Sequence, residues 1–327
     1  MAGYNTLRGL RVKYLSADPA GAEAGQVWYN STTSKLRLDG VTVAAAWASG
    51  AALNTFRQHG NGAGTTSAMI YAGGGNSPEV NLTEEYDGSS WTAGGVLPAI
   101  RADGAAFGVT TAAVYFGGTQ VNPADYKADT FEYDGSSWTG GGAYPAPISA
   151  QGATGVLTAG LGIGGWPTTS NTNEYDGSSW TSSGALNVAR SGGAYSGVGS
   201  QTASVYAGGY GPPSPGPSAA TEEYNGSAWT SVTAMPTATS STKGAGTLPS
   251  MIVFGGEVSG PSIVATTHAY DGTNWTSAPS MATARIQLGS GGTATSALAI
   301  SGVGPGLISA NEEFTGAHVA TESITTS

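Results

Sequence analysis

A motif of seven residues recurs along this chain and constrains its fold more than any other feature. The string EYDGSSW occurs at residues 85–91, 132–138 and 174–180, with the variants EYNGSAW at 223–229 and AYDGTNW at 269–275. A sixth copy, EFTGAHV at 313–319, lacks the tryptophan. Successive tryptophans are 42 to 49 residues apart, a period that is typical of propeller blades or of paired helices.

The spacing within each repeat is nearly constant. An arginine position lies ten residues after each tryptophan, beginning with Trp47 and Arg57. A glycine pair follows 16 residues later, or 18 in the fourth repeat, at the end of an apolar run such as AVYFGG. Only the step from this pair to the tyrosine varies widely, between 11 and 16 residues. Short β-branched and aromatic runs between glycines predict four strands per repeat, the last two joined by a DGSS hairpin.

Arginine, glycine pair, tyrosine and tryptophan in this order resemble the kelch repeat. The resemblance covers residues 47–316 and implies an all-β fold, a six-bladed kelch-like β-propeller. The chain departs from the kelch pattern at the missing sixth tryptophan and at four further positions, namely Ile148, Thr239, Ser301 and Phe314.

The ends of the repeat array predict how the ring closes. The sixth repeat has no tryptophan strand, whereas Trp47 precedes the first repeat. We expect the strand at Trp47 to complete the last blade, because this leaves no open sheet edge. A native strand beginning at Val319 is the alternative. The predicted domains are an N-terminal attachment segment (1–46), the propeller (47–316) and a C-terminal tail (317–327).

Two recurring side chains predict structural roles. Four repeats carry both the arginine and the glutamate before the tyrosine: Arg57 with Glu85, Arg101 with Glu132, Arg190 with Glu223, and Arg285 with Glu313. We predict a partly buried arginine–carboxylate pair in each, with independent surface charges as the alternative. The tryptophans are predicted to fill the gaps between neighbouring blades, and a solvent-facing ladder for glycans is the alternative.

Length variation is concentrated in the loops between the second and third strands, which share one face of the predicted propeller. Variable loops on a fixed scaffold are where binding usually occurs. We therefore predict a ligand on this face, and unconstrained drift of the loops is the alternative. The candidate residues are Glu79, Tyr126, Asp129, Trp166, Tyr210 and Glu257.

The first 46 residues differ chemically from the rest, since they hold five of the eleven basic residues. Strands at 27–29 and 35–38 are predicted to form a hairpin around the turn NSTTS. This stretch resembles a short motif near attachment regions of tailed-phage fibre and tail proteins. The resemblance implies attachment to other virion proteins through this segment, with the candidate residues Arg8, Arg11, Lys13, Trp28 and Tyr29.

Composition excludes several classes of protein. With 53 glycines in 327 residues and no cysteine, the chain fits neither a coiled coil nor a disulfide scaffold. The net charge of −10 argues against nucleic acid as a partner. We expect no signal peptide and no membrane insertion, because charges interrupt the N-terminus and no apolar run is long enough.

The chain also lacks the residues of known propeller enzymes. No cysteine can form the crosslink of galactose-oxidase-like enzymes, and the arginines occur one per blade instead of in a cluster. We therefore expect neither enzymatic activity nor a cofactor. The resemblances together imply an exposed component of a phage tail, a fibre or adhesin that binds a host-surface receptor or glycan and forms a homo-oligomer. A structural tail or capsid component without a receptor role is the alternative.

Overall fold

The structure is a computed structural model that describes residues 12–19, 26–38, 42–75, 79–120, 122–195, 199–211, 216–306, 308–319 and 322–324. These residues form strands and turns and contain no helix. The chain divides into two compact units, a larger one (Ala46–Thr315) and a smaller one that joins Met1–Ala45 to Gly316–Ser327. The prediction of an all-β fold is confirmed.

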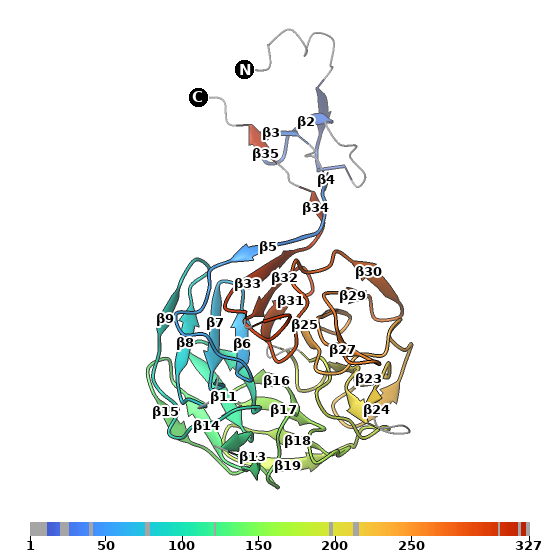
Figure 1. The fold of residues 1–327 in the computed structure, drawn as a ribbon. Coiled ribbons are helices and arrows are strands. Elements are labelled where there is room, and N and C mark those ends of the chain that lie inside the picture. The colour runs from blue at the N-terminus through green and yellow to red at the C-terminus, as the bar shows by residue number, and fades with distance from the viewer. Residues whose placement is uncertain are drawn as a thin grey trace. The chain divides into compact units, whose positions relative to one another are not determined.

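The larger unit is built from antiparallel sheets set around a common centre, in a propeller-like arrangement (Figure 1). Four of the repeats each form a sheet of four strands that lie in sequence order. They are β6 (Asn61–Thr65), β7 (Ala68–Ala72), β8 (Thr83–Tyr86) and β9 (Trp91–Ala93); β10 (Ala105–Val109), β11 (Ala112–Phe116), β14 (Thr130–Tyr133) and β15 (Trp138–Gly140); β16 (Gly152–Val156), β17 (Ala159–Ile163), β18 (Thr172–Tyr175) and β19 (Trp180–Ser183); and β25 (Lys243–Thr247), β26 (Ser250–Phe254), β29 (Thr267–Tyr270) and β30 (Trp275–Ala278).

The fourth repeat is less regular. It contains three strands, β20 (Ser204–Ala207), β23 (Thr221–Tyr224) and β24 (Trp229–Ser231), and an isolated bridge between Ala194 and Ala207 stands where the first strand is expected. Three of the variable loops form small two-stranded sheets. Their strands are β12 (Thr119–Gln120) with β13 (Asn122–Tyr126), β21 (Tyr210–Gly211) with β22 (Gly216–Pro217), and β27 (Glu257–Val258) with β28 (Ser262–Ile263).

The sheet of the sixth repeat combines both ends of the larger unit. Its strands are β31 (Gly289–Thr293), β32 (Ser296–Ile300), β33 (Asn311–Thr315) and β5 (Ala46–Gly50). In β5, Trp47 lies opposite Phe314 of β33. The indole N–H of Trp47 donates to Thr267 Oγ1 of the fifth repeat at 3.0 Å. The strand at Trp47 is thus paired with the last repeat, although it is the first strand of the unit in sequence.

The DGSS hairpins are closed by their aspartates. In the first copy, Asp87 Oδ1 accepts the backbone N–H groups of Ser89 and Ser90, both at 2.8 Å. These donors lower the pKa of Asp87 to about 2. Gly88 has a φ of 96°, a conformation that only glycine adopts without strain. The predicted hairpin between the third and fourth strands is confirmed.

Each intact tyrosine of the motif connects two neighbouring repeats. Its hydroxyl donates to the motif glutamate of the preceding repeat, in Tyr270 to Glu223 (2.7 Å), Tyr224 to Glu174 (2.6 Å), Tyr133 to Glu85 and Tyr175 to Glu132. Tyr86 of the first repeat donates instead to Glu313 of the sixth (2.5 Å). Burial and the hydrogen bond to Glu85 raise the pKa of Tyr133 to about 12. The motif glutamates therefore stabilise contacts between repeats.

The predicted partner of the arginines is wrong by one residue. The arginines pair not with Glu85, Glu223 and Glu313 but with the residue before each, in Arg57–Glu84 (2.5 Å), Arg190–Glu222 (2.6 Å) and Arg285–Glu312. Arg101 pairs with Asp129 instead of Glu132. Successive side chains of a strand point to opposite faces, so one glutamate faces its own repeat and the next faces the neighbouring repeat. A buried arginine–carboxylate pair inside a repeat is nevertheless present.

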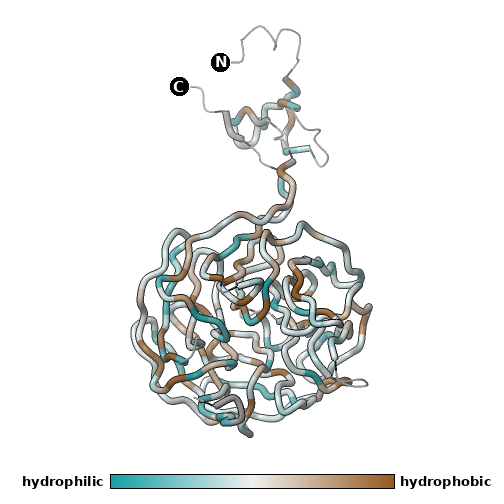
Figure 2. Tube along the Cα trace, viewed as in Figure 1, coloured by the Kyte–Doolittle hydropathy of each residue, from teal (hydrophilic) through white to brown (hydrophobic). Residues whose placement is uncertain are grey.

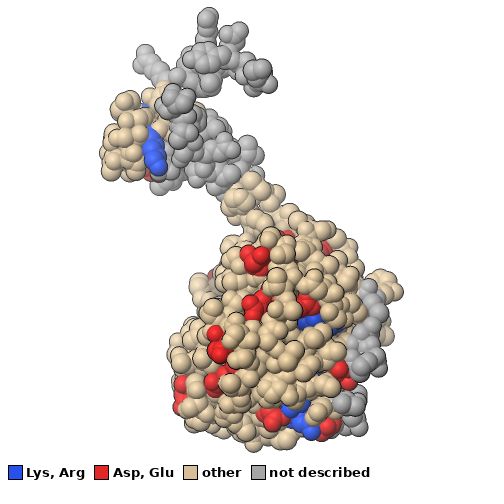
Figure 3. Space-filling view, turned by 90° about the vertical axis from the view of Figure 1, so that its left-hand side faces the viewer, with Lys and Arg blue, Asp and Glu red and all other residues tan. Residues whose placement is uncertain are grey.

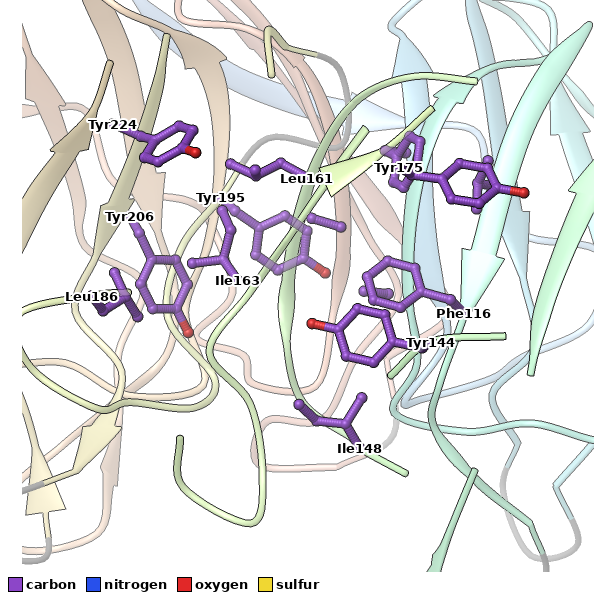
Figure 4. Packing of buried hydrophobic residues seen from close by; sticks show 14 of the residues in the cluster. Phe116, Tyr144, Ile148, Leu161, Ile163, Tyr175, Leu186, Tyr195, Tyr206 and Tyr224 are labelled. Carbon is purple, nitrogen blue, oxygen red and sulfur yellow. The ribbon is translucent and has the colours of Figure 1, made fainter. Parts of the chain in front are cut away.

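The tryptophans lie between neighbouring sheets, as predicted. Their indole N–H groups reach the preceding repeat, from Trp138 to Thr83 Oγ1 (3.0 Å), Trp180 to Thr130 Oγ1 (2.9 Å) and Trp229 to Thr172 Oγ1 (2.9 Å). Large apolar side chains fill the remaining space, with the rings of Phe116 and Tyr144 stacked 4.9 Å apart (Figure 4). Strongly hydrophobic residues form short stretches along the chain (Figure 2), which suits many short buried strands.

One junction between repeats lacks both members of the tyrosine–glutamate pair. The fifth repeat has Ala269 in the glutamate position, and the sixth has Phe314 in the tyrosine position. We expect Ala269→Glu and Phe314→Tyr to stabilise the protein more in combination than the sum of the single changes, by about 1–3 kcal/mol. Denaturant unfolding of the four proteins measures this coupling. Purely additive single effects would contradict the role given to the pair.

The smaller unit contains strands from both ends of the chain. Its sheet has the order β1 (Lys13–Leu15), β2 (Val27–Asn30), β3 (Lys35–Leu38) and β35 (Glu322–Ile324), and β4 (Thr42–Val43) pairs with β34 (His318–Val319). The predicted hairpin is confirmed as β2 and β3. The segment 317–327, predicted as a separate tail, instead contributes β34 and β35 to this unit, because these strands pair with β4 and β3.

Candidate functional site

Six residues, one per repeat, occupy equivalent positions directly after the glycine pairs. Each forms an isolated bridge with the residue that follows the arginine position, in the pairs Gly75–Gln58, Thr119–Ala102, Trp166–Ser149, Tyr210–Ser191, Glu257–Ser240 and Val303–Ile286. The second-to-third-strand loops begin here. Equivalent bridges place these residues at the same end of their sheets, and three consecutive repeats present Trp166, Tyr210 and Glu257.

These three residues line a pocket with a volume of about 440 Å³, which we name the rim pocket. Its other lining residues are Asp103, Thr119, Tyr126, Ser149, Ala150, Ser191, Gly192, Ser240 and Ser241. Trp166 is 41 % exposed and Tyr210 is 38 % exposed, although both are large hydrophobic residues. The indole N–H of Trp166 donates to Tyr126 Oη at 2.8 Å. The pocket therefore combines aromatic faces with hydroxyl and carboxylate oxygens.

Four of the six residues predicted for ligand binding thus lie together, namely Tyr126, Trp166, Tyr210 and Glu257. Glu79 lines an adjoining pocket of about 280 Å³, which shares Asp103 and Thr119 with the rim pocket. Asp129 lines neither of these two pockets. Its exposed carboxylate forms an ion pair with the buried side chain of Arg101.

A second set of six equivalent residues lies two positions after the arginine position, and we call this set the ring. His59, Asp103, Ala150, Gly192, Ser241 and Gln287 all have a φ between 50° and 62°. Their backbones link one repeat to the next, as in the N–H of Asp103 to His59 O (2.8 Å) and the N–H of His59 to Gln287 O (3.1 Å). Five of these six residues are not glycine, and residues held in this strained conformation cluster at functional sites.

This ring surrounds a smaller pocket of about 80 Å³, which we name the central pocket. It is lined by the six ring residues and by Gly60, Asn61, Gly104, Gln151, Tyr195, Thr242, Lys243 and Leu288. Tyr195 Oη accepts hydrogen bonds from the Asn61 amide at 2.5 Å and from Lys243 Nζ at 2.9 Å. These residues belong to the first, fourth and fifth repeats, so no spacing in the sequence predicted their contact.

An ion pair lies at the edge of the central pocket. His59 Nδ1 is 2.7 Å from Asp103 Oδ1. Burial lowers the pKa of His59, but the hydrogen bond and the negative charge of Asp103 outweigh this effect and raise it overall. His59 Nε2 has no hydrogen-bond partner among the described residues. The sequence singled out neither residue, although their fixed distance from the arginine position could have indicated them.

The residues predicted for attachment lie in the smaller unit, except that Arg8 and Arg11 are outside the described residues. Lys13 is exposed on β1, and the rings of Tyr29 and Tyr14 lie 4.5 Å apart. Trp28 is only 2 % exposed, and its indole N–H donates to Asp18 Oδ1 at 2.9 Å. Trp28 is therefore a core residue of this unit, which corrects its assignment as a contact residue.

Neither a metal centre nor a membrane span is found within the described ranges. No three histidine, aspartate or glutamate side chains there are grouped as metal ligands would be. No described helix is long and apolar enough to cross a membrane. Comparison with known proteins leaves the family open, since no protein-family model matches the chain and no curated protein matches it significantly.

Proposed function

We propose that the larger unit is a six-bladed, kelch-like β-propeller that the strand β5 closes. Three observations support this. The repeats supply six antiparallel sheets, and the first strands of neighbouring repeats contact one another, including β31 with β6. The pairing of β5 with β33 gives the sixth sheet its fourth strand, so that β33 has no free edge.

We further propose that this propeller is the glycan-binding part of an adhesin-type component of a phage tail. The observation that carries the proposal is the rim pocket, where the exposed rings of Trp166 and Tyr210 lie beside Tyr126 and Glu257. Exposed apolar side chains that gather in one patch with polar residues around them are typical of ligand-binding grooves. A sugar presents an apolar face, which stacks on an aromatic ring, and hydroxyl groups, which bond to polar side chains.

The attachment half of the proposal depends on the smaller unit. The hairpin of β2 and β3 carries the stretch that resembles attachment regions of tailed-phage proteins. We propose that this unit binds other virion proteins, that the protein forms a homo-oligomer there, and that host-surface glycans are the partners of the propeller. Immunogold labelling of purified phage particles tests the location. Labelling absent from the tail would contradict the proposal.

Trp166→Ala is expected to lower glycan affinity about thirty-fold, because truncating a central aromatic side chain typically costs 2 kcal/mol or more. The measurement is a glycan array with the full chain, followed by titration of each glycan that binds. Tyr14→Ala is the matched control, since Tyr14 is a 74 % exposed aromatic residue of the other unit. Unchanged glycan binding by the Trp166 variant would contradict the proposed site.

A further inference from the structure

Lys243 is an exception among the basic residues of the larger unit. The other five all form ion pairs, in Arg57–Glu84, Arg101–Asp129, Arg190–Glu222, Arg285–Glu312 and Lys127–Asp125. Lys243 forms no ion pair with any described carboxylate. Lys243 is half-buried and lines the central pocket. In a protein with so few charges, an unpaired lysine in a pocket points to a ligand that supplies the missing negative charge.

The position of the Lys243 side chain is well defined. Its Nζ donates to Tyr195 Oη at 2.9 Å and lies 4.6 Å from the centre of the Tyr195 ring. Tyr195 is only 2 % exposed and also accepts the Asn61 amide, so its hydroxyl is fixed across the central pocket. An ammonium group has three N–H donors. The two that Tyr195 does not use remain available to a group in the central pocket.

His59 supplies a second donor to the same pocket. Its Nδ1 is held by Asp103, which leaves Nε2 without a partner among the described residues. The groups that act on the His59 charge are Asp103, Glu79 and Lys243. A protonated His59 beside Asp103 forms a neutral pair, so the net charge of the pocket is then set by Lys243. Such a pocket favours an anion, although the unit around it is acidic (Figure 3).

The central pocket and the rim pocket adjoin each other. They share Asp103, Ala150, Gly192 and Ser241. A water molecule accounts for about 30 Å³ of liquid volume, so the central pocket of about 80 Å³ accommodates a group of a few heavy atoms. A whole sugar ring requires the rim pocket. One ligand can therefore occupy both, with its ring at the aromatic side chains and a small anionic substituent at Lys243.

We propose that Lys243 and His59 bind the carboxylate of an acidic sugar whose ring lies in the rim pocket. The inference rests on the proposed function and specifies the substrate class of the same site. A planar carboxylate accepts hydrogen bonds from both side chains, and charge-assisted bonds of this kind are the strong ones. A phosphate substituent is larger and tetrahedral, and is the competing chemistry for the test.

The test compares methyl glucuronide with methyl glucoside, which differ in the carboxylate, by calorimetric titration of the full chain. We expect the glucuronide to bind at least tenfold more tightly. Lys243→Met is expected to remove this preference. Lys127→Met is the matched control, because it removes the same charge from a lysine already paired with Asp125. A preference that survives Lys243→Met, or that glucose 6-phosphate exceeds, would overturn the inference.

A second measurement needs no variant. The chain has four lysines, Lys13, Lys35, Lys127 and Lys243, whose acetylation rates mass spectrometry resolves. Methyl glucuronide is expected to protect Lys243 alone, and methyl glucoside is not. Equal protection by both sugars overturns the carboxylate site while leaving sugar binding intact. If methyl glucuronide protects Lys243 equally well in the Trp166→Ala variant, the assignment of the sugar ring to the rim pocket is wrong. If a glutamate peptide protects Lys243 as well as the glucuronide does, the assignment to a sugar is wrong.

Discussion

Arg190→Met is expected to lower the free energy of unfolding by about 3–5 kcal/mol, because it leaves a buried carboxylate without its partner. The side chains of Arg190 and Glu222 are both fully buried, with Nη1 and Oε1 2.6 Å apart. Arg190 also donates to Tyr206 O at 3.2 Å, and Glu222 accepts the backbone N–H of Asn187 at 2.7 Å. Denaturant unfolding followed by tryptophan fluorescence measures the change.

The neighbouring glutamates of β23 provide the control. Glu222→Gln is expected to cost several kcal/mol, because it leaves the Arg190 charge buried and unpaired. Glu223→Gln is expected to cost about 1 kcal/mol, since Glu223 is less buried and accepts a single hydrogen bond, from Tyr270. If the two glutamine variants were equally destabilised, the assignment of Arg190 to Glu222 would be wrong.

Trp138→Ala is expected to cost about 3–5 kcal/mol, the usual range for removing a large buried aromatic side chain. Trp138 is 7 % exposed and packs against Tyr133, with ring centres 4.8 Å apart. Its indole N–H also donates to Thr83 Oγ1 of the preceding repeat. The substitution therefore removes packing inside one repeat and a hydrogen bond between two.

Trp275 is the matched comparison for this prediction. It occupies the same position in the fifth repeat, but it is half-buried, and its indole N–H donates to a backbone carbonyl, that of Thr233. We expect Trp275→Ala to cost less than Trp138→Ala in the same denaturant experiment. The reverse order would show that burial between repeats does not set the contribution of these tryptophans.

The pairing of most of the arginines follows a pattern in the sequence, at the position two residues before the tyrosine. The residue two before the tyrosine position is Glu84, Glu222 or Glu312 in three of the arginine repeats. The two repeats without arginine have uncharged residues there, Asn173 with Ile148 and His268 with Thr239. His268 is buried without hydrogen-bond partners, and burial lowers its pKa, so the uncharged form is favoured. The second repeat differs from this pattern. Phe131 occupies the position two residues before its tyrosine, and Arg101 pairs with Asp129 instead.

The junction of the fifth and sixth repeats follows the same logic. Ala269 stands in the position of the acceptor glutamate, and Phe314 stands in the position of the donor tyrosine. Both partners of one hydrogen bond are therefore replaced, although they lie in different repeats. Comparing each glutamate position with the tyrosine of the next repeat would have predicted this bond. Contacts between successive repeats can therefore be read from a repetitive sequence, provided that the correct pair of positions is compared.

The sequence by itself determined the strands, the aspartate–glycine hairpins and the end of the sheets at which Trp166 and Tyr210 lie, because local residue preferences and constant spacing control these features. The tertiary structure alone brought Asn61, Tyr195 and Lys243 into one pocket. Asn61 and Lys243 are more than 180 residues apart in the chain. Their contact depends on how the sheets are arranged around a common centre, and no local periodicity encodes that arrangement.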